Sequence, residues 1–172
     1  MILCIDPGLR GCGAAVFDHT AELQQANYVL NHKDTAGHRG AAVWGTMAEM
    51  VYEKYRAYYA FDKVLIETQI FRPTDETFKI AQILEVQGVA GAIAGLYTRQ
   101  SARIVDYRPH EWKSTVDGAI TTSRISQRIT PKEWENFKSH GRTGALDHNS
   151  LDAVGIGLHY FGRLEKQRVI VR

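Results

Sequence analysis

The order of strand-like and helix-like segments is the feature that most limits how this chain can fold. Three short apolar runs, at 2–5, 11–17 and 24–30, are separated only by turn-like sequences such as Asp6-Pro7-Gly8. Short turns join antiparallel neighbours, so we expect a three-stranded meander. Strand-like runs at 63–67 and 103–107 then alternate with helical segments at about 40–60, 77–98 and 147–163. This order predicts an α/β fold with a mixed five-stranded sheet, three antiparallel strands first and then parallel ones, flanked by helices.

Each long helical segment has one repeating side that predicts where it packs. In 40–60 and 147–163 this side is apolar, and it comprises Val43, Met47, Val51, Tyr55 and Tyr58 in the first and Leu151, Val154 (or Gly155) and Leu158 in the second. In 77–98 it is rich in small residues, namely Phe78, Ala81, Leu84 (or Glu85), Gly88, Gly91 (or Ala92) and Gly95. A glycine inside a helix costs about 1 kcal/mol relative to alanine, so we expect a neighbouring helix or sheet to approach closely there. Thr130 and Glu133 form a capping-box pattern that starts a further helix.

The size and composition of the chain favour one soluble domain, residues 1–172, with its own core. Cys4 and Cys12 are too few for a disulfide framework, and we interpret them as reduced core thiols. The first residues carry no basic leader and meet a charge at Asp6, which is typical of a strand and not of a signal peptide. The longest nearly apolar run, 88–97, is shorter than the roughly 20 residues that span a bilayer. We therefore expect a cytoplasmic protein without a membrane partner.

Charge is distributed unevenly along the chain. The first 86 residues carry 8 Lys or Arg and 11 Asp or Glu, whereas the remaining 86 carry 13 and 8. The segment 99–142 alone has nine basic residues against five acidic ones. An acidic half beside a basic half suits a nucleic-acid enzyme whose acids hold cations and whose flanks hold phosphates. An ordinary solvated surface would give the same numbers, so charge alone does not decide between the two.

Three acidic residues stand at the ends of predicted elements, where catalytic groups are often found. Asp6 ends the first strand, Glu67 ends the fourth, and Asp152 lies in the first turns of the last helix among apolar neighbours. Each has a simple alternative explanation: a turn former, a strand-end surface residue and a helix N-terminal charge. A carboxylate in an apolar setting is costly unless it is paired or bound to a cation. Three such cases together favour a shared cation.

The ligand chemistry of these residues indicates which cation. Carboxylate oxygens are hard ligands, which favour Mg²⁺ or Mn²⁺ over zinc. Two such ions can activate water and stabilise the leaving oxygen of a phosphodiester without a nucleophilic side chain. The sequence offers no convincing Ser/His/Asp or Cys/His arrangement as an alternative. We therefore expect a hydrolase with two Mg²⁺ ions per site, for which Mn²⁺ can substitute.

Several segments, in the same order along the chain, resemble the RuvC-type Holliday junction resolvases of the ribonuclease H-like superfamily. Ile5-Asp6-Pro7-Gly8 through Gly13 resembles the opening D-P-G-x-x-x-x-G, and Ile66-Glu67-Thr68-Gln69-Ile70-Phe71 resembles the second motif, an acid followed closely by an aromatic. Further matches are the long helix at 79–95, the basic segment at 107–118 and the closing Asp152-Ala153-Val154-Gly155-Ile156-Gly157. The D-P-G pattern alone would be weak, because sugar-kinase and actin-like folds also open with an acid and a glycine-rich turn. Trp112 and the altered last motif depart from the common pattern and favour a phage or divergent member.

The resemblance assigns roles to particular residues. It implies a ribonuclease H-like fold in which Asp6, Glu67 and Asp152 are catalytic metal ligands. Lys113 matches a lysine near the scissile phosphate, and Arg124 stands where a second basic residue contacts DNA. Phe71, or else Ile70, matches the wedge that stacks on a base at the junction centre; the alternative is a core aromatic beside the strand.

The fourth metal ligand departs from the pattern of the family. Its usual place, three residues before the last aspartate, is held by Asn149. His148, four residues before Asp152, would share its helix face, whereas Asp147, five before, lies roughly 140° away unless it precedes the helix as its N-cap. We favour Asp147 because its oxygens are hard ligands, with His148 and Asn149 as alternatives.

The resulting functional hypothesis is a homodimeric endonuclease of DNA recombination and repair that resolves four-way junctions by paired nicks. Two active sites that face opposite strands follow from a two-fold dimer, for which the helix at 88–95 offers a surface, although packing on its own sheet is an alternative. Other hypotheses are a broader branched-DNA or RNA–DNA hybrid nuclease of the same fold and a non-catalytic junction-binding protein. An actin-like phosphotransferase is a further class, which the short chain disfavours.

Overall fold

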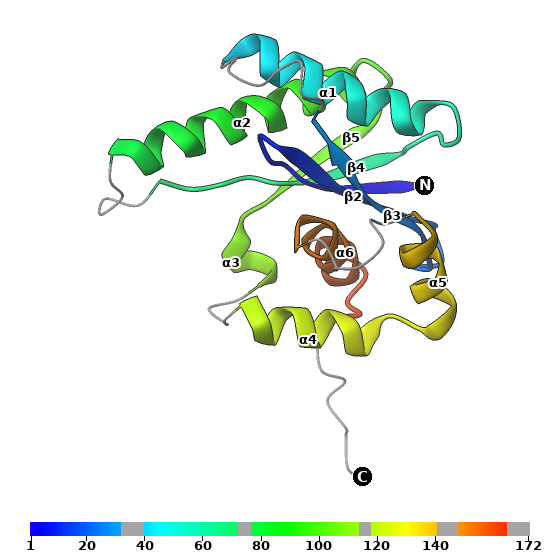
Figure 1. Cartoon of the computed structure of the whole chain (residues 1–172). Coiled ribbons are helices and arrows are strands. Elements are labelled where there is room, and N and C mark those ends of the chain that lie inside the picture. The colour runs from blue at the N-terminus through cyan, green and yellow to red at the C-terminus, as the bar shows by residue number, and fades with distance from the viewer. Residues whose placement is uncertain (32–39, 72–76, 114–117, 141–147, 165–172) are drawn as a thin grey trace.

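The protein forms a five-stranded sheet with helices on both faces (Figure 1). The structure is a computed structural model that describes residues 1–31, 40–71, 77–113, 118–140 and 148–164. The strands are β1 (Ile2–Asp6), β2 (Gly11–Phe17), β3 (Leu23–Leu30), β4 (Lys63–Glu67) and β5 (Arg103–Tyr107), in the spatial order β3-β2-β1-β4-β5. The pairs β1–β2 and β2–β3 are antiparallel, and β1–β4 and β4–β5 are parallel. The predicted α/β fold with a mixed sheet is confirmed.

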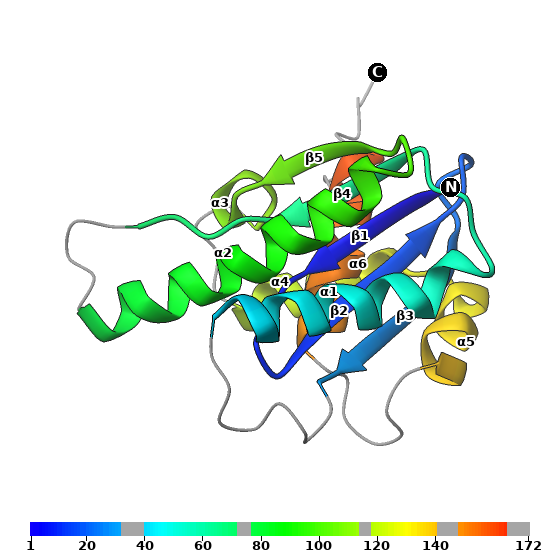
Figure 2. The same cartoon turned by 90° about the horizontal axis from the view of Figure 1, so that it is seen from above.

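Six helices cover the sheet among the described residues. They are α1 (Ala41–Arg56), α2 (Thr77–Thr98), α3 (Pro109–Trp112), α4 (Gly118–Arg128), α5 (Pro131–His140) and α6 (His148–Tyr160). Figures 1 and 2 show α1 and α2 side by side on one face, and α6 with α4 and α5 on the other. The helices α3 and α4 were not predicted, although Thr121, Ile125 and Ile129 recur every four residues in this polar segment and are buried.

The alternation of side chains along the strands divides the core in two. Leu3 and Ile5 of β1 belong to the cluster that packs under α1 and α2, whereas Ile2 and Cys4 belong to the cluster around α6. Because both faces of the central strands are covered, β1 and β2 are buried along their whole length. Cys4 and Cys12 are free and fully buried, which confirms the prediction of core thiols, and burial raises the pKa of Cys4 far above its ordinary value and that of Cys12 to about 12.

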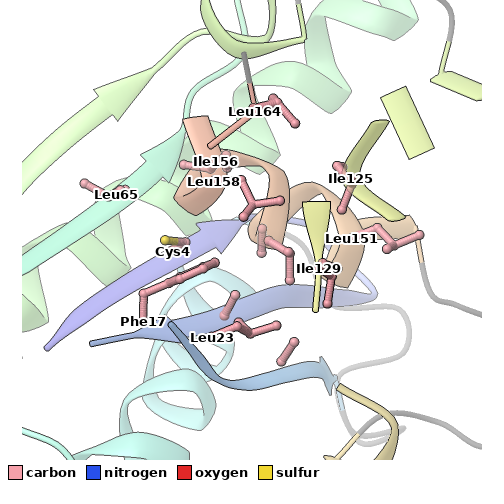
Figure 3. Packing of buried hydrophobic residues seen from close by; sticks show 14 of the residues in the cluster. Cys4, Phe17, Leu23, Leu65, Ile125, Ile129, Leu151, Ile156, Leu158 and Leu164 are labelled. Atoms are coloured by element: carbon pink, nitrogen blue, oxygen red, sulfur yellow. The ribbon is translucent and has the colours of Figure 1, made fainter. Parts of the chain in front are cut away.

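Glycines allow the central helix α6 to lie against its neighbours more closely than a side chain would permit. A Cβ added to Gly13 of β2 would lie 1.8 Å from the backbone oxygen of Asn149, at the start of α6. On α6 itself, a Cβ on Gly155 would lie 2.3 Å from the Trp112 ring and one on Gly157 would lie 2.1 Å from the Phe17 ring. Figure 3 shows Phe17 and the leucines and isoleucines of this cluster around the helix.

The predicted buried side of the first long helix is largely right, and that of the second is largely wrong. Val43, Met47, Val51 and Tyr55 of α1 are buried, but Tyr58 is exposed because the helix ends at Arg56. In α2 the buried residues are instead Val89, Ala90, Ile93 and Tyr97. Apolar residues occur all around α2, so their spacing did not identify the side that packs.

The glycines on the small-residue side of α2 differ in what lies next to them. Gly88 admits the Trp44 ring of α1, since an added Cβ would lie 2.2 Å from that ring. At Gly91 and Gly95, by contrast, an added Cβ would meet no other described atom within 4 Å, and Leu84 is exposed. The expected close approach is therefore confirmed at Gly88 and is not provided by the described chain at Gly91 and Gly95.

One helix among the described residues, α2 at Lys79–Thr98, is long and apolar enough to cross a membrane by length and composition. From the sequence we expected no membrane-spanning segment, because the longest nearly apolar run, 88–97, is too short. The helix passes the test of length and composition because its apolar window extends back to Lys79. Length and composition are weak evidence for a membrane span, and α2 packs along α1 and against β4 and β5. Only 22% of its apolar window is buried, so the helix carries much apolar surface that the described residues do not cover.

A buried ion pair ties the last helices together. Glu133 and Thr130 form the predicted capping box, with the Thr130 N–H donating to Glu133 Oε2 (2.8 Å) and the Glu133 N–H to Thr130 Oγ1 (3.2 Å). Arg163, beyond the end of α6, donates to both carboxylate oxygens of Glu133 and to the Arg128 carbonyl. Burial alone would raise the pKa of Glu133, but the hydrogen bonds that its carboxylate accepts, first from Arg163 and then from the Leu23 and Thr130 N–H groups, lower it to about 2.

Candidate active site

Two of the predicted acids lie side by side because β1 and β4 are parallel neighbours. Ile5 of β1 pairs with Ile66 of β4, and the next residues of the two strands are Asp6 and Glu67. Cys4 and Leu65, two positions earlier in each strand, face α6. Side chains two positions apart on a strand point to the same face, so both acids also lie on the α6 face, at the carboxyl ends of their strands. Both side chains are almost fully buried, with 7% and 2% of their surface exposed.

The third acid comes from the helix that covers this face. Asp152 lies in the second turn of α6 and is 4% exposed. The close contact of Gly13 with Asn149 seats the first turn of α6 directly on β2, the neighbour of β1. The third predicted acid thus reaches the strand ends from α6, three residues beyond the contact that fixes the position of this helix.

Lys113 joins the acids. It follows α3, and its Nζ lies 2.7 Å from Asp152 Oδ2 and 3.3 Å from Glu67 Oε2. The charge of Asp6 also acts on this ammonium group. The structure therefore brings together Asp6, Glu67, Asp152 and Lys113, which come from four segments far apart in the sequence.

The buried setting shifts the protonation equilibria at this site. Burial raises the pKa of Glu67; the charge of Lys113 and a hydrogen bond from Trp112 oppose the shift without cancelling it, and the charge of Asp152 adds to it. Burial by itself would lower the pKa of Lys113, but the charge of Glu67 and the hydrogen bond to Asp152 outweigh it and raise the pKa. The Glu67 carboxylate and the Lys113 ammonium carry opposite charges, so each favours the charged form of the other.

The donor chemistry of the site fits a divalent cation. Within the described ranges, no three His, Cys, Asp or Glu side chains converge closely enough to form a metal site on their own. The acids nevertheless offer only oxygen donors, and they already surround one positive group, the ammonium of Lys113. Buried carboxylates outnumber that ammonium, so the site attracts further positive charge.

The three candidates for the fourth ligand are placed differently. Asp147 lies outside the described residues. His148 is largely exposed, and its Nε2 lies 3.3 Å from Asp152 Oδ2, as expected for residues one turn apart. The amide nitrogen of Asn149 faces Gly8, where an added Cβ would lie 3.0 Å away. Of the two described candidates, His148 is the one that reaches the acid group.

Of the predicted DNA-contacting residues, Lys113 lies within the acid group, whereas no described contact joins Phe71 or Arg124 to it. Phe71 is 48% exposed, and Ile70 beside it is also exposed, so the alternative that Phe71 is a core aromatic is wrong. Arg124 is half-buried on α4, next to Ile125, which packs against α6. The described contacts do not bring Arg124 to Lys113 or the acids.

Two residues that contact Glu67 were missed as functional candidates. The Trp112 indole donates to Glu67 Oε2 (2.8 Å), and the Gln69 amide donates to Glu67 Oε1 (2.9 Å). Trp112 was noted only as a departure from the family pattern. A tryptophan in an otherwise polar and basic segment, directly before the lysine, was the available signal.

Comparison with solved structures identifies the fold. RuvC of Thermus thermophilus in complex with a Holliday junction substrate matches with a TM-score of 0.60 and 15% identity, over 95% of this chain and 94% of that chain. The fowlpox virus resolvase in complex with Holliday junction DNA matches with a TM-score of 0.56 and 15% identity, over 94% and 99%. The yeast mitochondrial Holliday junction resolvase matches with a TM-score of 0.56 and 10% identity, over 95% and 81%.

These matches confirm the predicted RuvC-like, ribonuclease H-type fold along almost the entire chain. No protein-family model and no curated protein matches the sequence. At 10–15% identity the likeness concerns the fold alone, because one fold can carry many different chemistries.

Proposed function

We propose that this protein is a metal-dependent endonuclease that resolves four-way DNA junctions. The observation that carries the proposal is that the Lys113 ammonium bridges Glu67 of β4 and Asp152 of α6, while Asp6 of the neighbouring strand acts on it through its charge. This arrangement stands at the carboxyl ends of β1 and β4, in a fold shared with three structures that are described as Holliday junction resolvases.

The acids are the groups that would hold the cations. Asp6, Glu67 and Asp152 would bind two Mg²⁺ ions, with Asp147 as the fourth ligand by its chemistry and His148 as the alternative by its position. The ions would supply positive charge at the phosphate and activation of the attacking water. Their binding would also offset the cost of burying three carboxylates.

Lys113 has a distinct part in this proposal. The side chain of Lys113 is 22% exposed, which leaves room for a phosphate oxygen to approach it. The acids keep it protonated by raising its pKa. Cations bound by the acids would release Lys113 from Glu67 and Asp152, so that it can pair with the negative charge of the phosphodiester.

Recognition of the junction would use the surface around the site. Exposed Ile70 and Phe71 follow β4 directly beyond Glu67, where an apolar side chain can stack on an unpaired base at the centre of a junction. Arg124 and the other basic residues of 99–142 would hold the arms through phosphates, which gives recognition of shape and a steep dependence on salt.

We propose that the active form is a homodimer joined through α2. Leu84, Gly91 and Gly95 present apolar and small groups that the described chain does not cover, and Gly91 and Gly95 are four residues apart on one helix face. A second α2 can approach closely there and cover the apolar surface. The wild type should then have twice the 19.4 kDa mass of one chain by light scattering.

Substitutions at two glycines test this interface. Gly91→Arg should produce the monomer mass and lose paired nicking. Gly45→Arg, on α1 at a position that is also open to 4 Å, should leave the dimer intact. A wild-type protein that is monomeric at micromolar concentration would remove the dimer from the proposal.

Substrate comparison tests the proposed activity. A labelled four-way junction should be cut in Mg²⁺ or Mn²⁺ and remain intact in EDTA, while linear duplex and RNA–DNA hybrid are cut at least 10-fold more slowly. Equal cutting of flaps, forks and junctions would favour the broader branched-DNA nuclease. Tight binding without cutting by the wild type would favour the non-catalytic junction-binding protein.

A further inference from the structure

The carboxylate of Glu67 is held on both of its oxygens by neutral donors. Trp112 Nε1 donates to Oε2 at 2.8 Å, and Gln69 Nε2 donates to Oε1 at 2.9 Å. The two donors lie on different segments, Trp112 at the end of α3 and Gln69 just beyond β4. Two donors on opposite oxygens fix both the position and the rotation of the carboxylate plane.

Trp112 is itself held rigidly. It is 3% exposed, and its ring lies so close to α6 that a Cβ on Gly155 would be 2.3 Å from it. The ammonium of Lys113 lies 4.6 Å from the centre of the same ring, in range of a cation–π interaction. This packing holds the indole in the position from which its N–H donates to Glu67.

Gln69 is fixed through its backbone. The Gln87 amide of α2 donates to the Gln69 carbonyl at 2.5 Å. This bond attaches the segment after β4 to the long helix, so the second donor to Glu67 also has a rigid support.

The molecule contains a second indole–carboxylate pair, which joins α1 to α2 and has no described contact with the acid group. Trp44 Nε1 donates to Glu85 Oε2 at 2.7 Å, and the Trp44 ring packs on Gly88 as the Trp112 ring packs on Gly155. Glu85 also accepts from the Gly40 N–H and thus joins α1 to α2. This pair is an internal control, because it has a structural role at the contact of two helices.

We infer that Trp112 is a positioning residue that, together with Gln69, orients the Glu67 carboxylate for cation binding and cleavage. The inference rests on the proposed nuclease function. Hydrogen-bond partners of metal ligands are typically worth about 10- to 100-fold in metal affinity or activity. Loss of the indole N–H should therefore lower the rate constant of cleavage and not the affinity for the junction.

The decisive comparison is Trp112→Phe against Trp44→Phe. Both variants keep an aromatic ring and lose one indole hydrogen bond to a carboxylate. Trp112→Phe should lower single-turnover cleavage of the junction about 10- to 100-fold and raise the Mg²⁺ concentration for half-maximal rate, with junction affinity in Ca²⁺ within about two-fold of the wild type. Trp44→Phe should be destabilised to a similar extent yet cleave at the wild-type rate. Equal cleavage rates for the two variants would overturn the inference.

A spectroscopic measurement keeps the inference testable if the wild type cuts no substrate, in which case the proposed function has failed. In ¹⁵N-labelled metal-free protein, the Trp112 indole N–H signal should shift on Glu67→Gln, and the Trp44 indole signal should not. Glu85→Gln should shift the Trp44 indole signal and leave the Trp112 indole signal unchanged. If the chemical shift of the Trp112 indole N–H does not change on Glu67→Gln, the hydrogen bond is refuted and the inference with it.

Discussion

Substitution of Gly13 by alanine tests the link between the packing of α6 and the geometry of the acids. A Cβ at this position would lie 1.8 Å from Asn149 O, 2.1 Å from Asn149 C and 2.6 Å from Ser150 N. All three are backbone atoms at the start of α6, so no side chain can rotate away. Since real Cβ contacts essentially never fall below 3.0 Å, the helix and β2 must separate by more than an ångström.

The expected size of the effect follows from this displacement. Overpacking of a core by one methyl group typically costs about 1–3 kcal/mol, and a rigid backbone contact belongs at the upper end. For a chain of this length that cost lowers the melting temperature by roughly 5–10 °C. Asp152 moves with the first turns of α6, and a misplacement of about 1 Å can lower the rate of a positioned reaction about 100-fold.

Thermal unfolding and single-turnover junction cleavage measure the two effects separately. Gly45→Ala is the matched control, because an added Cβ in the second turn of α1 meets nothing within 4 Å and should stabilise the protein by about 1 kcal/mol. If Gly13→Ala unfolds and cleaves like the wild type, the close seating of α6 on β2 is refuted. If it is destabilised but cleaves at the wild-type rate, the seating stands and its connection to the site is refuted.

Two further predictions concern charged groups. Glu133→Gln should lower the free energy of unfolding by about 2–3 kcal/mol at pH 7, since it removes one partner of a buried pair whose pKa is lowered to about 2. Because the folded-state pKa is depressed, this contribution is complete above the ordinary pKa of 4.5 and is lost as the pH falls towards 2. Urea unfolding between pH 7 and 3 should thus show wild type and variant converging; a constant gap would refute the assignment. Lys113→Met should leave Glu67 and Asp152 without their ammonium, so that 10 mM Mg²⁺ raises the melting temperature of the variant more than that of the wild type. An equal Mg²⁺ effect on both would contradict the shared cation site.

The sheet and the meeting of Asp6 with Glu67 at one of its edges could be predicted from the sequence because both follow from local patterns. Turn residues beside short apolar runs specify the meander, and helical crossovers make β4 and β5 parallel to β1. Once β1 and β4 are parallel neighbours, Asp6 and Glu67 must meet at the same edge. Asp152 was recognisable as a charge on an apolar helix.

Other features depend on tertiary contacts that no local pattern contains. The hydrogen bond from Trp112 to Glu67 spans 45 residues and requires the close fit of Gly155. The buried side of α2 was missed because apolar residues occur all around that helix, so their spacing does not mark one side. The helix α4 was missed because its few apolar residues are separated by polar and basic ones.

Cleavage of a labelled four-way junction by wild type, Glu67→Gln and Glu85→Gln tests the central claim most directly. Both variants remove the charge of a glutamate that accepts an indole hydrogen bond, but only Glu67 belongs to the acid group. The wild type and Glu85→Gln should produce paired, Mg²⁺-dependent nicks at the junction. Glu67→Gln should bind the junction with wild-type affinity and cut it at least 1,000-fold more slowly, about 4 kcal/mol in the barrier. Cutting by Glu67→Gln at the wild-type rate would contradict the assignment of this site.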